Sequence, residues 1–208
     1  MIYRKKIPQT DISLSETLLE SGWSKLKEPK NLFTAVLLSV PFMILNVAIV
    51  AFIVPPISAL FTDMSRHFSS GGISFNINLV LIIAGLLAVF VLLVVHEMLH
   101  AVLIPNFIKS KKTFWGITPF GGFVSTTEEI SKIRFILISI FPFIILSIVL
   151  PLFLYLIGIY NGFITFLVLL NAAASSVDIL NVLLVIFQVS GKSNIISNGF
   201  ETFHKRFE

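Results

Sequence analysis

The chain has 208 residues, of which 56% are hydrophobic and only 12% are charged, and its formal net charge is +4. Soluble domains normally contain about 45–50% apolar and about 25% charged residues, so this composition excludes an ordinary soluble protein and predicts an integral membrane protein. The basic residues lie beside apolar runs, where membrane orientation explains the positive charge and no nucleic-acid partner is required.

Residues 1–31 form a polar segment that allows two interpretations. Its apolar side chains have the spacing of one short amphipathic helix, which would lie at the membrane interface. These side chains are Ile12, Leu14, Leu18, Leu19 and Trp23. A loosely ordered cytoplasmic tail explains the segment equally well.

Four apolar runs follow, each long enough to cross a membrane, since a spanning helix needs about 20 residues. The runs cover residues 32–61, 77–104, 136–159 and 163–189. We therefore predict an all-α integral membrane protein with about four transmembrane helices, in which residues 32–190 form the membrane domain and residues 191–208 a cytoplasmic C-terminal tail.

The basic residues predict the orientation of these spans. They concentrate in the N-terminal segment, in the loop 105–134 and in the C-terminal tail, whereas the loop 62–76 carries only Arg66. By the positive-inside rule, both termini and the loop 105–134 are cytoplasmic.

The loop after the second span contains a stretch, residues 114–125, that is rich in aromatic and β-branched residues. Pro119 and Gly121-Gly122 interrupt this stretch, which predicts two short extended segments joined by a tight turn. We expect a membrane-associated β-loop whose exposed edge binds an unfolded peptide by β-addition. The alternative is a simple interfacial loop with Trp115 as its aromatic anchor.

The end of the second span carries the pattern His-Glu-x-x-His, with His96, Glu97 and His100. Residues four apart lie on nearly the same face of a helix, so the two histidines can offer their imidazole nitrogens to one Zn2+ ion. Glu97 lies beside them as the candidate catalytic residue, a general base that would take a proton from water and return it to a leaving amine.

A catalytic zinc site usually has three protein ligands, so a third is needed. The chain contains no cysteine, and Asp178 is the one carboxylate besides Glu97 within the four spans. A carboxylate at the bilayer centre costs about 2.5–3.5 kcal/mol, and a metal ion shared with two histidines would offset that cost. We predict that His96, His100 and Asp178 bind the metal.

The fourth span carries a polar stripe of Asn171, Ser175, Asp178 and Asn181, whose spacings of four and three place them on one face. Ser175 would orient the carboxylate of Asp178, and Asn171 would bind an extended substrate backbone. Hydrogen bonding between helices, which uses the same residue types, is the alternative.

These residues resemble the site-2 protease family of intramembrane zinc metalloproteases and, more narrowly, the small bacterial putative zincin peptidase family. The matching pieces stand in the family's order: residues 96–100 late in a membrane helix, residues 118–124 with their two glycines, Pro142, and residues 171–178. One departure is Val177-Asp178-Ile179, where the family usually has Leu-Asp-Gly.

The resemblance implies a bacterial cell membrane and a β-loop that presents substrate as a strand. Within that loop, Gly121, Gly122 and Phe123 would bind the substrate.

We therefore predict a zinc-dependent intramembrane endopeptidase that hydrolyses membrane-protein or peptide substrates near the cytoplasmic face of the lipid bilayer. Two alternatives stay open: a membrane protein whose metal site is structural or catalytically inactive and serves as an interaction partner, and a cation transporter. Glu97 favours the enzyme, since a structural site needs no base, and the sequence lacks the repeated halves typical of transporters.

Overall fold

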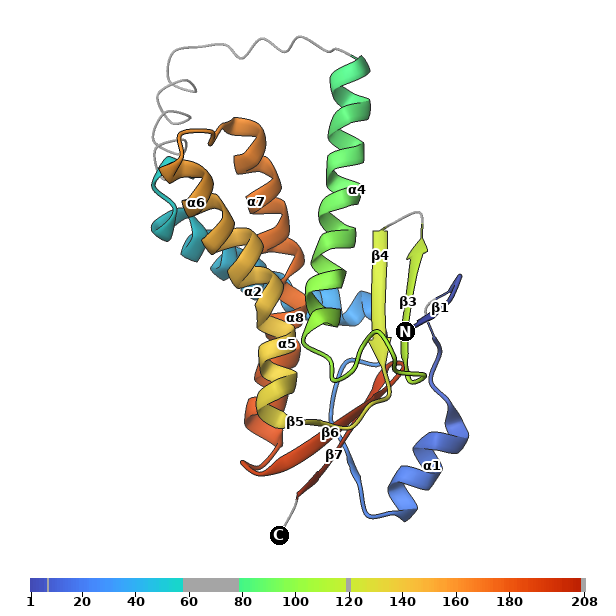
Figure 1. The fold of residues 1–208 in the computed structure, drawn as a ribbon. Coiled ribbons are helices and arrows are strands. Elements are labelled where there is room, and N and C mark those ends of the chain that lie inside the picture. The colour runs from blue at the N-terminus through green and yellow to red at the C-terminus, as the bar shows by residue number, and fades with distance from the viewer. Residues whose placement is uncertain (7, 58–78, 119–120, 207–208) are drawn as a thin grey trace.

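Four long helical segments dominate the computed structural model, which describes residues 1–6, 8–57, 79–118 and 121–206 (Figure 1). By length and composition, each is apolar enough to cross a membrane. The segments are α2 (Leu32–Ile53), α4 (Leu79–Val102), a third made of α5 (Lys132–Ile144), η1 (Ile145–Val149) and α6 (Leu150–Leu156), and a fourth made of α7 (Gly162–Ala174) and α8 (Ser176–Gln188).

The helix boundaries follow from local chemistry. The third segment starts at Lys132, earlier than the apolar run suggests, because the Ser131 side chain caps it by accepting a hydrogen bond from the Arg134 backbone N–H. The Asn161 side chain likewise caps α7. The first segment ends at Ile53, two residues before Pro55-Pro56.

The all-α description is too narrow, because two small sheets accompany the helices. One sheet has the strand order β1-β3-β4 and the other β2-β7-β6-β5. Their strands are β1 (Ile2–Tyr3), β2 (Ser24–Lys25), β3 (Thr113–Thr118), β4 (Gly121–Thr126), β5 (Ile130–Ser131), β6 (Ser193–Asn198) and β7 (Glu201–Arg206).

The β3–β4 hairpin confirms the two extended segments expected after the second span. Trp115 lies opposite Val124 and Gly116 opposite Phe123 in the antiparallel register. A Cβ atom at Gly116 would clash with the backbone carbonyl oxygen of Arg4 and would lie 2.5 Å from the Phe123 ring, so the glycine makes room for both. Pro119, at the expected turn, and the loop 62–76 lie outside the described residues.

Both terminal segments are folded, and they pair with each other. Helix α1 (Ile12–Glu20) forms the short helix that was one of the two interpretations of the N-terminal segment. The C-terminal residues form the β6–β7 hairpin, in which Ile195 on β6 and Phe203 on β7 are fully buried. Strand β2 pairs with β7, which joins the two ends of the chain in one sheet.

The two sheets sit at one end of the helices, near the C-terminal end of α4. Strands β5, β6 and β7 and helix α1 lie beyond that end, at the lower part of Figure 1, while the β3–β4 hairpin lies beside the adjoining half of α4. An apolar cluster joins the end of α8 to the second sheet. It comprises Leu26, Ile130, Val185, Val189 and Ile195. This packing fixes the end of α8, and therefore Asp178, relative to the sheets.

Candidate metal centre

The side chains of His96, His100 and Asp178 converge on one point between α4 and α8. The Nε2 atoms of the two histidines lie 3.2 Å apart. The Asp178 carboxylate oxygens lie 3.3 Å from His96 Nε2 and 3.6 Å from His100 Nε2. Tetrahedral zinc with bonds of about 2.0–2.1 Å holds its ligand atoms about 3.3–3.4 Å apart. The three side chains are therefore positioned as metal ligands.

The hydrogen bonds of the two imidazoles aim both Nε2 lone pairs at this point. His100 Nδ1–H donates to the carbonyl oxygen of Ile138 at 2.8 Å, and His96 Nδ1–H donates to Asn171 Oδ1 at 2.9 Å. A neutral imidazole with its proton on Nδ1 has a lone pair on Nε2. Two lone pairs and a carboxylate facing one another repel unless a cation lies between them, so this donor set fits a zinc ion.

Pro142 explains why the Ile138 carbonyl is available to His100. In a regular α-helix this carbonyl would accept a hydrogen bond from the backbone N–H four residues later, at position 142. Proline has no N–H, and Pro142 lies inside α5. The Ile138 carbonyl on α5, which lacks this helix hydrogen bond, therefore orients the metal ligand His100 on α4.

A break in the fourth segment places Asp178 in the first turn of a helix. Helix α7 ends at Ala174 and α8 begins at Ser176. The N-terminus of a helix favours a carboxylate, because its first N–H groups have no partner in the helix. Asp178 therefore has a favourable position even among apolar residues.

Ser175, which was expected to orient the carboxylate of Asp178, lies at this break and bonds to the backbone of its own segment. Its hydroxyl is fully buried and donates to the backbone carbonyl of Asn171 at 2.9 Å. A serine hydroxyl often bonds to a carbonyl one turn earlier on the same helix, an option that a face argument from spacing does not consider.

Asn171, which was expected to bind a substrate backbone, is a hydrogen-bond partner of His96 in the structure. Only 1% of its surface is exposed. Its Oδ1 accepts from His96, while its Nδ2 donates to Ser147 Oγ at 2.8 Å and to the carbonyl oxygen of Pro142 at 3.4 Å. All its polar atoms are used inside the protein, so none is left for a substrate.

Glu97 connects the metal centre to the hairpin. Its Oε2 accepts a hydrogen bond from the backbone N–H of Val124 on β4, at 3.0 Å. Gly122 lets the strand come this close, because a Cβ atom there would lie 3.3 Å from Val94 Cα and 3.6 Å from Glu97 Cβ. The glycine at position 122 therefore serves the packing of β4 against α4.

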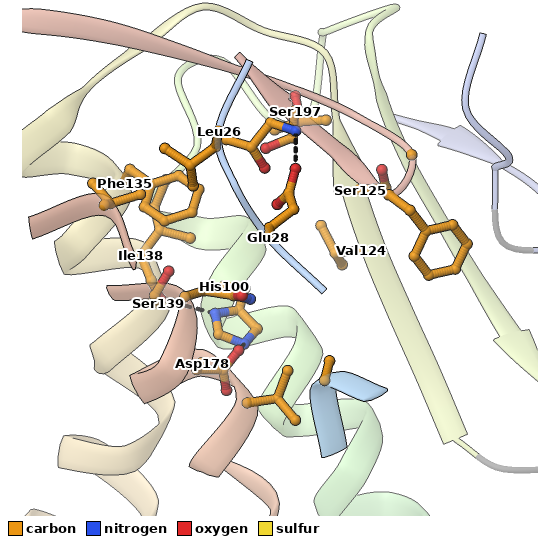
Figure 2. A pocket seen from close by; sticks show the side chains of 18 of the residues that line it. Leu26, Glu28, His100, Val124, Ser125, Phe135, Ile138, Ser139, Asp178 and Ser197 are labelled. Carbon is orange, nitrogen blue, oxygen red and sulfur yellow. Dashed lines mark hydrogen bonds and ion pairs between the residues drawn. The ribbon is translucent and has the colours of Figure 1, made fainter. Parts of the chain in front are cut away.

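A cavity of about 420 Å³ adjoins these side chains. Glu97, His100 and Asp178 line one part of it, and it extends to Phe200, which is 48% exposed on the turn between β6 and β7. Figure 2 shows His100 and Asp178 close together, with Glu28 on the side toward Ser197. The cavity thus links the metal centre to the end of the molecule that carries the second sheet.

The cavity wall includes strand residues that directly follow the predicted substrate contacts. Val124, Ser125 and Thr126 line the cavity, whereas Gly122 packs against Val94. Phe123 is only 7% exposed and packs on Gly116.

Two cavity residues have roles that sequence reasoning did not assign. Asn181, which belongs to the polar stripe, lines the cavity beside Asp178. Glu28 lines it as well, and nothing in the sequence near Glu28 signals this position, because it depends on a contact with Thr202.

Comparison with known protein families finds that residues 89–193 match the family described as Putative zincin peptidase. The matched stretch is about half of the chain and contains His96, Glu97, His100 and Asp178. Searches among curated proteins and among solved structures found no match.

Proposed function

The chain belongs to the Putative zincin peptidase family, and on that premise we propose that it is an intramembrane zinc endopeptidase related to the site-2 proteases. The family suggests a zinc metallopeptidase and implies a zinc cofactor. The observation that carries the finer proposal is the placement of Glu97 beside three convergent ligands, next to a cavity that Glu97, His100 and Asp178 line.

A membrane location is supported by the apolar surface of the helices. Large apolar side chains are exposed along them, including Phe52 at 90%, Leu156 at 81% and Phe187 at 81%. Apolar patches of this extent are unfavourable in water and need lipid or another apolar partner. The metal centre lies on two of these apolar segments, α4 and the α7–α8 pair.

The proposed chemistry is hydrolysis of a peptide bond. Bound zinc would polarise the carbonyl oxygen of that bond and make water more acidic. Glu97 accepts a proton from the water, whose oxygen bonds to the carbonyl carbon. When the C–N bond breaks, Glu97 returns the proton to the leaving amine nitrogen. Asn171 and the carbonyl of Ile138 hold the two imidazoles in the required tautomer throughout.

Strand β4 supports the delivery of an extended substrate. It is the edge strand of its sheet, and its residues 124–126 line the cavity. A peptide that pairs with this edge is extended, which exposes its carbonyl groups. In a membrane helix those carbonyls are engaged in helix hydrogen bonds, so a helical substrate segment must unwind before cleavage.

The test is a pair of zinc and cleavage measurements on purified protein reconstituted in liposomes. Glu97→Gln should retain one zinc ion per chain and lose cleavage of a membrane-anchored reporter, because the amide cannot accept the proton. Glu16→Gln, on the exposed surface of α1, is the matched control. Unchanged cleavage by Glu97→Gln would exclude the proposed base, and a wild-type protein that binds zinc but cleaves nothing would favour a structural metal site.

A further inference from the structure

Glu28 is a carboxylate on the cavity wall that the proposed chemistry does not use. It lies between β2 and α2 and lines the same cavity as Glu97 and Asp178. Its Oε1 accepts a hydrogen bond from the backbone N–H of Thr202 at 2.6 Å. In Figure 2 its side chain lies between Leu26 and Val124, on the same side of His100 as Ser197.

Glu28 is the carboxylate of the cavity that stands apart from the metal centre. Among the described residues, the wall includes Glu28, Glu97 and Asp178 and neither lysine nor arginine. A zinc ion at the metal centre would offset the charges of Glu97 and Asp178, which leaves Glu28 without a cation. Lys25 forms its ion pair with Glu201, and within the described chain Glu28 takes part in no ion pair. Burial raises the pKa of Glu28, because it removes part of the hydration of the carboxylate.

The position of the cavity indicates which molecule would bring a positive charge to Glu28. The cavity reaches the end of the helices where the second sheet lies, next to the Lys- and Arg-containing segments of the chain. By the positive-inside rule this is the cytoplasmic side, and membrane proteins carry excess lysine and arginine in the short segments that flank their spans on that side. A substrate span that enters here brings basic side chains toward the carboxylate of Glu28.

We infer that Glu28 is a specificity-determining residue that selects substrates with a lysine or arginine on the cytoplasmic flank of the cleaved span. The basic side chain binds the Glu28 carboxylate while Thr202 holds one oxygen of that carboxylate in place. This inference rests on the proposed function. It defines the substrate class as membrane proteins whose basic flank lies close to the scissile bond.

The experiment uses the full-length protein, loaded with zinc and reconstituted in liposomes. Membrane-anchored reporters differ at one flank position, which carries Lys, Gln or Glu and is moved residue by residue away from the cleaved bond. The wild type should cleave the best Lys reporter about tenfold faster than its Gln counterpart, as expected for a hydrogen bond between charged groups. Glu28→Gln, which can still accept from Thr202, should reduce this Lys-to-Gln ratio to about one, and Glu28→Lys should favour the Glu reporter.

Glu16→Gln is the control, because Glu16 is an exposed acidic residue on α1 that does not line the cavity. This variant should keep the wild-type Lys-to-Gln ratio. A wild-type ratio near one at every position, or a ratio that survives in Glu28→Gln, would overturn the inference and leave the proposed function standing.

Fluorescently labelled peptides with the Lys and Gln flank sequences of these reporters give a readout without turnover. Their binding to Glu97→Gln protein is followed by fluorescence anisotropy. Tighter binding of the Lys peptide that depends on Glu28 supports the inference even if no reporter is cleaved. Equal binding of the Lys and Gln peptides would contradict it. Absence of cleavage by the wild type with every reporter would instead count against the proposed function.

Discussion

Replacing Pro142 with alanine tests how α5 supports the metal centre. The substitution restores a backbone N–H that would donate to the carbonyl oxygen of Ile138, which accepts from His100 Nδ1–H at 2.8 Å. A carbonyl oxygen can accept two hydrogen bonds, so the bond from His100 would be weakened but not broken. A buried hydrogen bond contributes about 0.5–1.5 kcal/mol, and we expect zinc to bind about 3–10-fold more weakly.

The assay is competition for zinc between the purified protein and a chelating dye of known affinity. Pro41→Ala is the matched control, because Pro41 lies inside α2, where the same change restores a helix N–H away from the histidines. Circular dichroism should show that both variants keep the wild-type helix content. Wild-type zinc affinity in Pro142→Ala would refute the proposed link between the missing helix bond and His100.

Two further substitutions test the support of the site. Asn171→Ala removes the acceptor of His96 Nδ1–H and should weaken zinc binding about 10–100-fold in the same competition assay, whereas wild-type affinity would show that this contact does not orient the ligand. Gly122→Val places side-chain atoms against Val94 and should destabilise the protein by about 1–3 kcal/mol in a detergent unfolding experiment. Gly191→Ala is its control, since no atom lies within 4 Å of the added Cβ, and equal unfolding curves for the two variants would contradict the packing role of Gly122.

The metal centre shows what local sequence patterns can predict. The spacing of His96 and His100 predicts one helix face, and the cost of a carboxylate in an apolar span points to Asp178 as their partner. Both arguments use the residues themselves and the bilayer, without knowledge of how the helices pack. The structure brings these three side chains together, while their roles in catalysis stay predictions.

The residues that support the metal ligands show where such patterns fail. Residues on a shared helix face, such as Asn171 and Ser175, are predicted to point in one direction. The spacing does not predict with which atoms they form hydrogen bonds. In the structure α7 ends just before Ser175, and Asn171 meets His96, which is 75 residues away in the sequence. Pro142 leaves the Ile138 carbonyl free to orient His100. This contact can be predicted only when the positions of α4 and α5 relative to each other are known.

The strand pairing of the two terminal segments was not predicted from the sequence, for a related reason. Strand β2 is two residues long and pairs with β7, with Ser24 opposite His204. Such a pairing joins the two ends of the chain, and short strands leave little periodicity to detect. The position of Glu28 on the cavity wall depends on this pairing, so it emerges only from the folded chain.

The central claim is that α4 and α8 share one zinc ion through His96, His100 and Asp178. Zinc X-ray absorption spectroscopy on the purified protein and on Asp178→Ala tests it most directly. We predict one zinc ion per wild-type chain with two imidazole nitrogens and carboxylate oxygen at about 2.0–2.2 Å, and loss of the carboxylate contribution with weaker zinc retention in the variant. A wild-type spectrum without two imidazoles, or an Asp178→Ala spectrum identical to it, would contradict the shared site.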